Sequence, residues 1–448
     1  MSVAELLAAH GVPGAAVGVL RHGEVTEYAV GVRDAATGAP VTTDTVFQCG
    51  SQTKTWTALA FLGLVDEGKA GLDEPVRALL PGFAVADPDT TRRLTPRHLL
   101  HHTDGIEEAY GDPGEGDDVL ERMVAAIADA PQVFPLGRTH GYSAALGHAV
   151  LARILEVVDG KPWEQVMRDR LFTPMGLTST NTRPDQVDPT RGAVGHLLGD
   201  HGPVRTPVDH LPRAFGPGGG LTSTVGEVLT LAHVLLGEGV APNGRRIVSA
   251  GALREMTHSR VPVPDPYLFG PAWGLGLIVC DWHGRTVYAT DGSTIGQNAR
   301  LRLLPDEGMA VAVLTNGGPR ESLFRAVFDE ILGAGTVPAP PTPDPARTLD
   351  EARYTGVYER PGARYEVSST GTALRLALVT DPARAAITGT PERVEHDLLA
   401  VSDEHFVTGP ADDQWTVALY EVAGTRYLHT NARAHPRTGV IPGGGPES

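Results

Sequence analysis

Apolar residues in the first 335 positions form strand-like runs at both ends and helix-spaced patterns between them. Residues 15–21 and 27–32 are short apolar runs joined through His22-Gly23, which is typical of a β-hairpin. Later runs, spaced like an antiparallel meander, lie at 275–279, 286–289, 299–304 and 309–314. Because strands open and close this region, we predict an α+β fold. It has one antiparallel sheet flanked by helices, with a helical domain inserted at about residues 72–211.

A proline-rich stretch at residues 336–347 is followed by a different pattern. Proline fixes the backbone, so this stretch is predicted to be an extended, semi-rigid linker. Short strand-like segments come after it, at 364–367, 373–378, 415–420 and 426–429. We therefore predict a larger domain at 1–335, a small all-β barrel or curled sheet at 348–440, and a loose tail at 441–448.

Composition and charge exclude some partners. Hydrophobic residues make up 41% of the 448 positions and charged residues 20%, as in an ordinary globular protein. The formal net charge of -17 argues against nucleic acid and against an anionic membrane as partners. The two cysteines do not indicate a disulfide framework. Cys49 is interpreted as a small buried hydrophobe, with a nucleophilic role as the less favoured alternative.

The N-terminal residues have no basic start, and Pro13-Gly14 interrupts the next apolar run. We therefore expect neither a signal peptide nor a transmembrane span, and a cytoplasmic location by default.

A Ser-x-x-Lys motif, Ser51 to Lys54, precedes an apolar run typical of a buried helix. If the helix begins at Ser51, that residue is a good cap and Lys54 lies one turn on, on the same face. A serine needs a base beside it to act as a nucleophile, and burial of a lysine disfavours its charged form. The motif thus offers a nucleophile and its base, although a cap followed by a solvated lysine remains the alternative.

Two other stretches have residue types found in phosphate or metal sites. Residues 216–224 are rich in glycine, but no lysine follows them as a phosphate-binding loop requires, so a pocket wall or close backbone packing is favoured. His98, His101 and His102 suggest a metal, yet no carboxylate or cysteine has matching spacing. A structural role is preferred, and we expect no metal and no cofactor.

Several segments occur in an order typical of one superfamily. They are residues 10–17, Phe47 to Lys54, Leu94 to Gly105, Tyr142-Ser143, Phe172 to Leu177 and Gly218 to Thr224. Over about residues 8 to 333, the chain resembles the serine β-lactamase and penicillin-binding-protein-like superfamily, in its class C-like esterase, D-peptidase and transesterase branch. Residues 354–358 resemble the first strand of the lipocalin-like barrel that often follows this domain.

The resemblance implies roles for particular residues. Ser51 would be the acylated nucleophile, with Lys54 and Tyr142 sharing the proton transfers. The oxyanion hole would be formed by the backbone N–H groups of Ser51 and Ser293. Trp273 would line the cleft. Arg433 of the C-terminal domain would contact substrate if that domain lies over the site. The alternative is that the C-terminal domain only stabilises the protein and that its arginines are solvated.

The chain departs from the family pattern at two motifs. Ala144 stands where the second motif commonly has asparagine. Thr290-Asp291-Gly292, which should contact substrate, replaces Lys-Thr-Gly or His-x-Gly, so a cation that would meet a substrate carboxylate is missing and Asp291 adds the opposite charge. Both departures argue against β-lactam hydrolysis and fit esterase or acyl-transfer branches.

We therefore expect a serine hydrolase or acyltransferase that acts through a Ser51 acyl-enzyme on an ester, thioester or amide of a small molecule or peptide. One alternative is a penicillin-binding-protein-type thioesterase, a peptide cyclase or a D-stereospecific peptidase. An alternative of another class is a binding protein on the same fold with weak or no catalysis.

Overall fold

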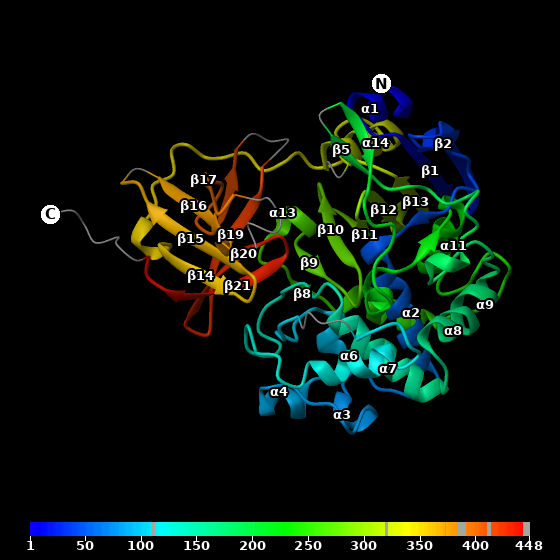
Figure 1. Cartoon of the computed structure of the whole chain (residues 1–448), viewed down its shortest axis with the longest axis horizontal. Coiled ribbons are helices and arrows are strands. Elements are labelled where there is room, and N and C mark those ends of the chain that lie inside the picture. Colours follow the sequence, from blue (N-terminus) through cyan, green and yellow to red (C-terminus); the bar gives the residue numbers. More distant parts are fainter. Residues whose placement is uncertain are drawn as a thin grey trace.

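A computed structural model describes residues 1–108, 113–199, 201–318, 321–371, 373–382, 391–409 and 414–441. Figure 1 shows two domains, a larger mixed one at the right and a barrel at the left, joined by an extended segment. In the larger domain the described strands include an antiparallel sheet in the order β3-β2-β1-β13-β12-β11-β10-β9-β8. The predicted α+β fold with a C-terminal barrel is confirmed.

The sheet is assembled from both ends of the domain because β1 pairs with β13 along its whole length. Strands β1 and β2 form the predicted hairpin. The strands of the larger domain are β1 Gly14–Arg21, β2 Glu24–Asp34, β3 Ala39–Pro40, β4 Phe47–Gln48, β5 His196–Gly199, β6 Gly202–Arg205, β7 Thr222–Ser223, β8 Val261–Pro262, β9 Ala272–Trp273, β10 Ile278–Trp282, β11 Arg285–Thr294, β12 Gln297–Leu304 and β13 Met309–Thr315.

Helices cover both faces of this sheet. One face packs on α1 and α14 through Leu7, Val313 and Phe324, while the other packs on α2 and α11 within the largest hydrophobic core. The helices are α1 Val3–Ala9, α2 Thr53–Asp66, α3 Val76–Leu79, α4 Pro88–Arg93, α5 Pro96–Leu100, α6 Val119–Ala126, α7 Leu146–Asp159, α8 Trp163–Met167, α9 Thr173–Met175, α10 Gly216–Gly219, α11 Val225–Leu236, α12 Ala250–His258, α13 Pro266–Phe269 and α14 Glu321–Leu332.

Two local predictions were wrong. The end of the expected helical insertion is the β5–β6 hairpin, which is anchored to the main domain where the His196 N–H donates to the Asn316 carbonyl. The strand expected at 275–279 begins only at Ile278. Gly276 has a φ of +79°, which an extended strand does not accommodate, so residues 274–276 form a turn.

The second domain is a closed barrel of β14 to β21 in sequential order. Alternate residues face inward and form a separate core that includes Tyr358, Val367 and Phe406. The strands are β14 Gly356–Arg360, β15 Ala363–Ser369, β16 Leu374–Val379, β17 Arg393–Ala400, β18 His405–Thr408, β19 Thr416–Val422, β20 Thr425–Thr430 and β21 Arg433–Gly439. None of the described helices is long and apolar enough to cross a membrane.

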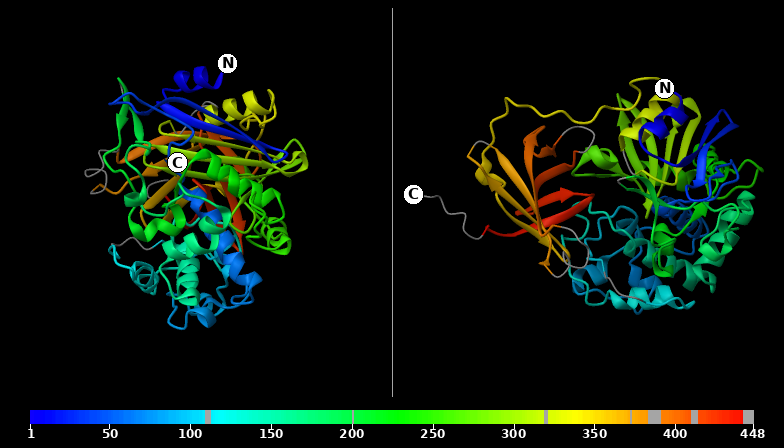
Figure 2. Two further views of the ribbon diagram at one scale, coloured as in Figure 1. Left: turned by 90° about the vertical axis from the view of Figure 1, so that its right-hand side faces the viewer. Right: turned by 45° about the horizontal axis from the view of Figure 1, so that its top comes forward.

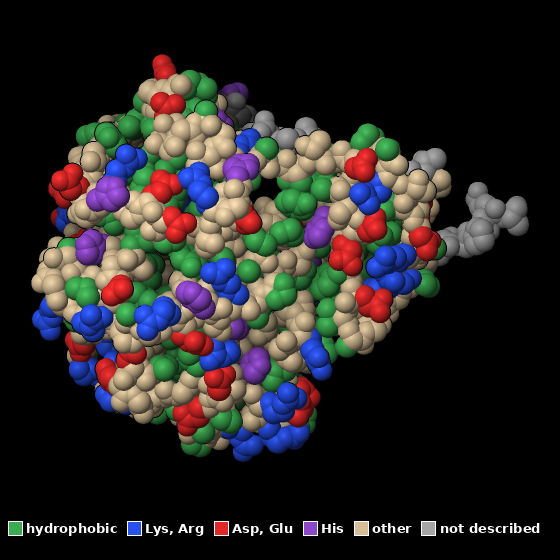
Figure 3. Space-filling model, turned by 180° about the vertical axis from the view of Figure 1, so that it is seen from behind, with side chains coloured by type: hydrophobic (Ala, Val, Ile, Leu, Met, Phe, Trp, Pro, Cys, Tyr) green, Lys and Arg blue, Asp and Glu red, His purple; other side chains and the backbone are tan. Residues whose placement is uncertain are grey.

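The barrel packs against the larger domain, and Figure 1 and the right view of Figure 2 show β20 and β21 on the side that faces it. Polar contacts across the interface include Thr416 to Asp265 at 2.6 Å and Thr139 to Tyr420 at 3.0 Å. Seen from behind, Figure 3 shows the barrel in contact with the larger domain, and basic and acidic side chains interspersed over both. The two domains are therefore joined by specific polar contacts between side chains of both.

Candidate active site

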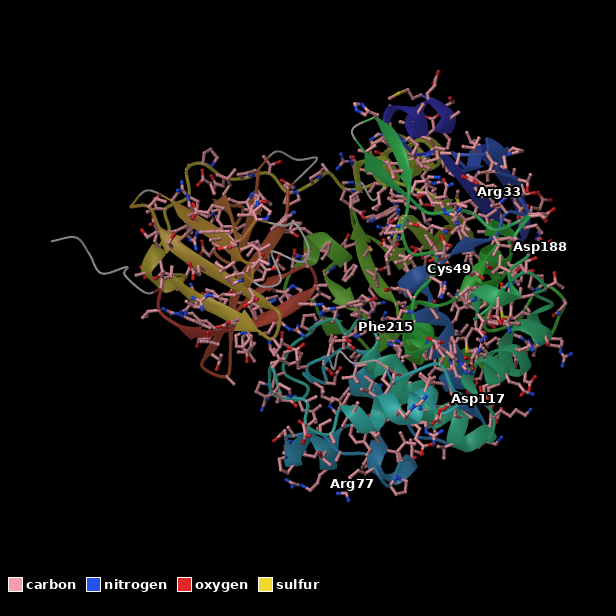
Figure 4. All side chains as sticks on the ribbon, viewed as in Figure 1. Arg33, Cys49, Arg77, Asp117, Asp188 and Phe215 are labelled. Atoms are coloured by element: carbon pink, nitrogen blue, oxygen red, sulfur yellow. The ribbon has the colours of Figure 1, made fainter. Side chains whose placement is uncertain are left out.

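Ser51 lies in a single 3-10 turn, Gly50–Gln52, that leads into α2. Figure 4 labels Cys49, two residues earlier, near the centre of the larger domain. The turn is pressed against β11: a Cβ atom added to Gly292 would lie 1.8 Å from the Cys49 carbonyl oxygen. The helix begins at Thr53, and Ser51 makes no capping hydrogen bond. The expectation of a capping Ser51 was therefore wrong, which leaves its hydroxyl available to Lys54.

Lys54 is buried, with 2% of its surface exposed. Its Nζ atom lies 3.2 Å from Ser51 Oγ, 2.6 Å from the Ala144 carbonyl oxygen and 2.7 Å from the Gly218 carbonyl oxygen. All three oxygens accept hydrogen bonds from the Lys54 amine. The two carbonyls therefore hold Nζ beside the Ser51 hydroxyl, within hydrogen-bond reach of the residue expected to be the nucleophile.

Tyr142 packs beside this pair on the loop before α7. Lys54 Nζ lies 4.9 Å from the centroid of the Tyr142 ring. The ring also packs on His102 at 4.6 Å and Trp273 at 5.7 Å between centroids. Tyr142 is thus placed at the site, and its share of the proton transfer stays a prediction.

The backbone of Ser293 on β11 lies against the nucleophile turn. A Cβ atom added to Gly50 would lie 2.6 Å from Ser293 N, and one added to Gly292 would lie 2.8 Å from Ser51 N. The Ser293 side chain points elsewhere, since its Oγ donates to Asn298 Oδ1 at 2.8 Å. The two N–H groups expected to stabilise an oxyanion therefore belong to adjacent segments.

The third motif divides between the two faces of β11. Thr290 faces α2, where Thr55 Oγ1 donates to its hydroxyl at 2.7 Å. Asp291 faces the other way, where its carboxylate forms two hydrogen bonds with Arg302 and lies 3.7 Å from Arg300 Nε. Successive side chains in a strand point to opposite faces, so the Asp291 carboxylate pairs with these arginines on the side of β11 opposite Thr290. Asp291 also lines the cavity, and its contact with substrate stays a prediction.

Ser51, Lys54, Tyr142, Trp273 and Thr290 line one small cavity. The rest of its wall includes the apolar side chains of Phe269, Leu277, Ile278 and Ala289, together with Thr55, Gly276 and Asp291. Trp273 is 4% exposed, and its indole N–H donates to the Leu100 carbonyl at 3.1 Å, so it is a fixed wall of the cavity.

Arg433 is not among the lining residues of that cavity. It begins β21, directly after Ala432, whose carbonyl accepts a hydrogen bond from the Tyr142 N–H at 2.8 Å. The barrel hairpin thus reaches the edge of the site, and contact between Arg433 and substrate stays a prediction.

The cysteine and the histidines noted in the sequence have other surroundings. Burial raises the pKa of the Cys49 thiol well above its usual range, which disfavours a thiolate nucleophile. His98 caps α5 at Thr95, His101 contacts the Ser259 carbonyl at 3.0 Å, and His102 Nδ1 accepts from the Ser143 N–H at 3.1 Å. Among the described residues no group of His, Cys, Asp or Glu side chains could hold a metal ion.

Sequence reasoning missed three groups at the site. The carbonyls of Ala144 and Gly218 hold Lys54, and the buried Glu108 holds the loop that carries Tyr142. The direction of a backbone carbonyl cannot be predicted from residue type. Glu108 could have been noticed, because it is one of two adjacent acidic residues shortly after the Leu94 to Gly105 segment.

The fold and the serine-lysine pair define a serine hydrolase of the penicillin-binding-protein-like kind. The chain belongs to the Beta-lactamase family, whose model matches residues 2–336. It is 43% identical to penicillin-binding protein 4 of Amycolatopsis lactamdurans over 364 residues, 79% of this chain and 94% of that protein. It is 33% identical to esterase EstB of Burkholderia gladioli over 208 residues, 43% of this chain and 52% of that protein.

Among solved structures, the chain is similar to SurE. The two share 29% sequence identity and superpose with a TM-score of 0.77, which covers 97% of each chain. A structure of SurE with D-Leu superposes equally well, with a TM-score of 0.77 and 28% identity. This likeness extends over the barrel as well as the larger domain.

Proposed function

We propose that this protein is a serine enzyme that forms an acyl-enzyme on Ser51. The hydroxyl oxygen attacks a carbonyl carbon while its proton passes to Lys54 Nζ, and the N–H groups of Ser51 and Ser293 stabilise the oxyanion. The proton then goes to the leaving group, with Tyr142 in the relay, and the bond to that group breaks. Water or an amine attacks the ester and regenerates Ser51.

The observation that carries this proposal is the surrounding of Lys54. Two carbonyl acceptors and the serine hydroxyl account for the three directions of its amine, at 2.6, 2.7 and 3.2 Å. This arrangement holds Nζ within hydrogen-bond reach of the Ser51 hydroxyl, as a base for that serine must be. A binding protein on this fold does not require this arrangement.

The substrate we propose is a small molecule or peptide that ends in an apolar D-residue. The carbonyl group of that residue forms the ester, thioester or amide that Ser51 attacks. The mostly apolar wall formed by Phe269, Trp273 and Ile278 favours an apolar side chain. The likeness to SurE, which has been solved with D-Leu, over 97% of the chain favours the D configuration. A thioesterase or peptide cyclase and a D-stereospecific peptidase both fit this description.

Matched esters test the substrate class. We expect the p-nitrophenyl ester of N-acetyl-D-leucine to be turned over at least about tenfold faster than its L enantiomer, measured as kcat/KM from nitrophenolate release. Ser51→Ala is the control for background hydrolysis. An added primary amine distinguishes the two classes, since a transferase forms the amide and a hydrolase the free acid. Equal or L-preferring turnover would contradict the D-residue proposal.

A further inference from the structure

Two adjacent carboxylates are buried next to the catalytic loop. Glu107 is 2% exposed and Glu108 is 6% exposed. Burial of an ionised carboxylate is unfavourable unless it is paired and hydrogen-bonded. The two side chains have different partners, one in the barrel and one in the catalytic loop.

Glu108 holds the loop that follows Tyr142. Its Oε1 atom accepts hydrogen bonds from Ser143 Oγ at 2.7 Å, from Ala144 N at 2.5 Å and from Ala145 N at 3.3 Å. This carboxylate therefore binds the two backbone N–H groups that directly precede α7. It fixes the peptide of Ala144, whose carbonyl lies 2.6 Å from Lys54 Nζ.

Glu107 connects this arrangement to the barrel. Arg360, the last residue of β14, donates from Nε to Oε2 at 2.9 Å and from Nη2 to Oε1 at 2.6 Å. Both side chains of the pair are nearly inaccessible, at 7% and 3% exposure. Glu107 Oε1 also accepts the Glu108 backbone N–H at 2.9 Å.

A continuous set of hydrogen bonds therefore runs from the barrel to the nucleophile. It passes from Arg360 to Glu107, to Glu108, to Ala144 and on to Lys54. The barrel makes a second contact at the other end of the same loop, where the Ala432 carbonyl accepts the Tyr142 N–H at 2.8 Å.

We propose that Glu108 is a positioning residue for Lys54 and Tyr142, and that the docked barrel holds it in place through the Arg360–Glu107 pair. The inference rests on the proposed function of Ser51. Ala144 has no side-chain amide to hold Lys54, and the carbonyl fixed by Glu108 does this instead. Arg360 of the barrel then supports the position of the catalytic loop of the larger domain.

Variants at Glu108 test whether this residue positions Lys54 and Tyr142. Glu108→Ala is expected to lower kcat about 100-fold on a p-nitrophenyl ester, with KM changed by less than about threefold, because a shift of about 1 Å at the base has such a cost. Glu108→Gln keeps an acceptor oxygen and is expected to recover kcat to within about tenfold of the wild type. An Ala variant that melts at a lower temperature but keeps its kcat would overturn the positioning role, as would a Gln variant no better than Ala.

Variants of the Arg360–Glu107 pair test whether the docked barrel holds Glu108 in place. Arg360→Met leaves a buried unpaired carboxylate, so Glu107→Leu/Arg360→Met, which removes both charges, is measured with it. We expect the double variant to regain thermal stability and still to label at Ser51 with a fluorophosphonate about tenfold or more slowly than the wild type. Recovery of the full labelling rate together with stability would overturn the role of the barrel.

Thr416→Val is the matched control, since it removes an interface hydrogen bond to Asp265 that is not connected to Glu108. We expect it to label at the wild-type rate, and slow labelling of this variant would mean that docking alone matters. Failure of wild-type Ser51 to label would reject the proposed function instead. Wild-type labelling with an unaffected Glu108→Ala would reject only this inference.

Discussion

Replacement of Lys54 with methionine is expected to slow the acylation of Ser51 by about 10³-fold, because proton transfer by a positioned base contributes about 10²–10⁴-fold. Lys54 is the basic side chain within hydrogen-bond reach of Ser51 Oγ, at 3.2 Å. Methionine has a similar length and preserves much of the packing around α2. The measurement is the second-order rate of fluorophosphonate labelling at a fixed pH.

The control for this loss is Lys69→Met. Lys69 is half exposed and pairs with Glu67 at 2.7 Å, away from the site. This variant should label like the wild type. The melting temperature of Lys54→Met is measured as well, because the carbonyls of Ala144 and Gly218 lose their donor. A folded Lys54→Met protein that labels within about tenfold of the wild-type rate would contradict the assignment of Lys54 as the base.

Acid is expected to destabilise this protein steeply, because four histidines are fully buried beside the site and the domain interface. They are His102, His140, His148 and His429, and burial lowers the pKa of each, that of His140 to about 3. Their rings pack together: His102 lies 5.5 Å from His148 and 5.8 Å from His140, which lies 6.1 Å from His429. Protonation of this cluster would bury several like charges near Lys54.

The direction follows from proton linkage. Since the folded-state pKa values lie below the unfolded value of about 6.5, the unfolded state binds more protons in acid. The stabilisation is present above about pH 6.5 and is lost as the pH falls toward the folded-state values. Each histidine contributes about 1.4 kcal/mol per pH unit below about pH 6, so four contribute about 5.6 kcal/mol per unit, a large part of a typical stability.

The free energy of unfolding in urea, measured from pH 7.5 to 5.5, checks this expectation. His429→Phe should reduce the total change in the free energy of unfolding between pH 7.5 and 5.5 by about 1.4 kcal/mol, since one histidine fewer takes up a proton on unfolding. His210→Gln, which changes an exposed histidine, is the matched control for the substitution. A free energy of unfolding that is flat between pH 7.5 and 5.5 would contradict the buried neutral cluster.

The side-chain pattern predicted most of the architecture. Two apolar runs joined through His22-Gly23 predicted the β1–β2 hairpin, and helix-spaced patterns between the two groups of strands predicted the helical insertion. In the barrel, β17 was not predicted because Leu398 is its only buried residue and its first five positions include four charged or polar side chains. The three-residue spacing of Ser51 and Lys54 placed both on one turn, where the structure has them in hydrogen-bond contact.

The rest of the site depends on backbone groups and long-range contacts. The carbonyls of Ala144 and Gly218 hold Lys54, and residue type does not encode where a carbonyl points. Arg360 meets Glu107 across 253 positions of sequence, so only the docking of the barrel reveals the pair. The orientation of the Asp291 side chain could have been predicted from the sequence, since neighbouring residues in a strand point to opposite faces and Asp291 follows Thr290.

The most direct test of the central claim is the mass of the intact protein after treatment with p-nitrophenyl acetate or a fluorophosphonate, for the wild type and Ser51→Ala. The account predicts one adduct on the wild type, mapped to Ser51, and none on the variant. An unmodified wild-type protein, or an adduct that persists in Ser51→Ala, would contradict the acyl-enzyme on Ser51.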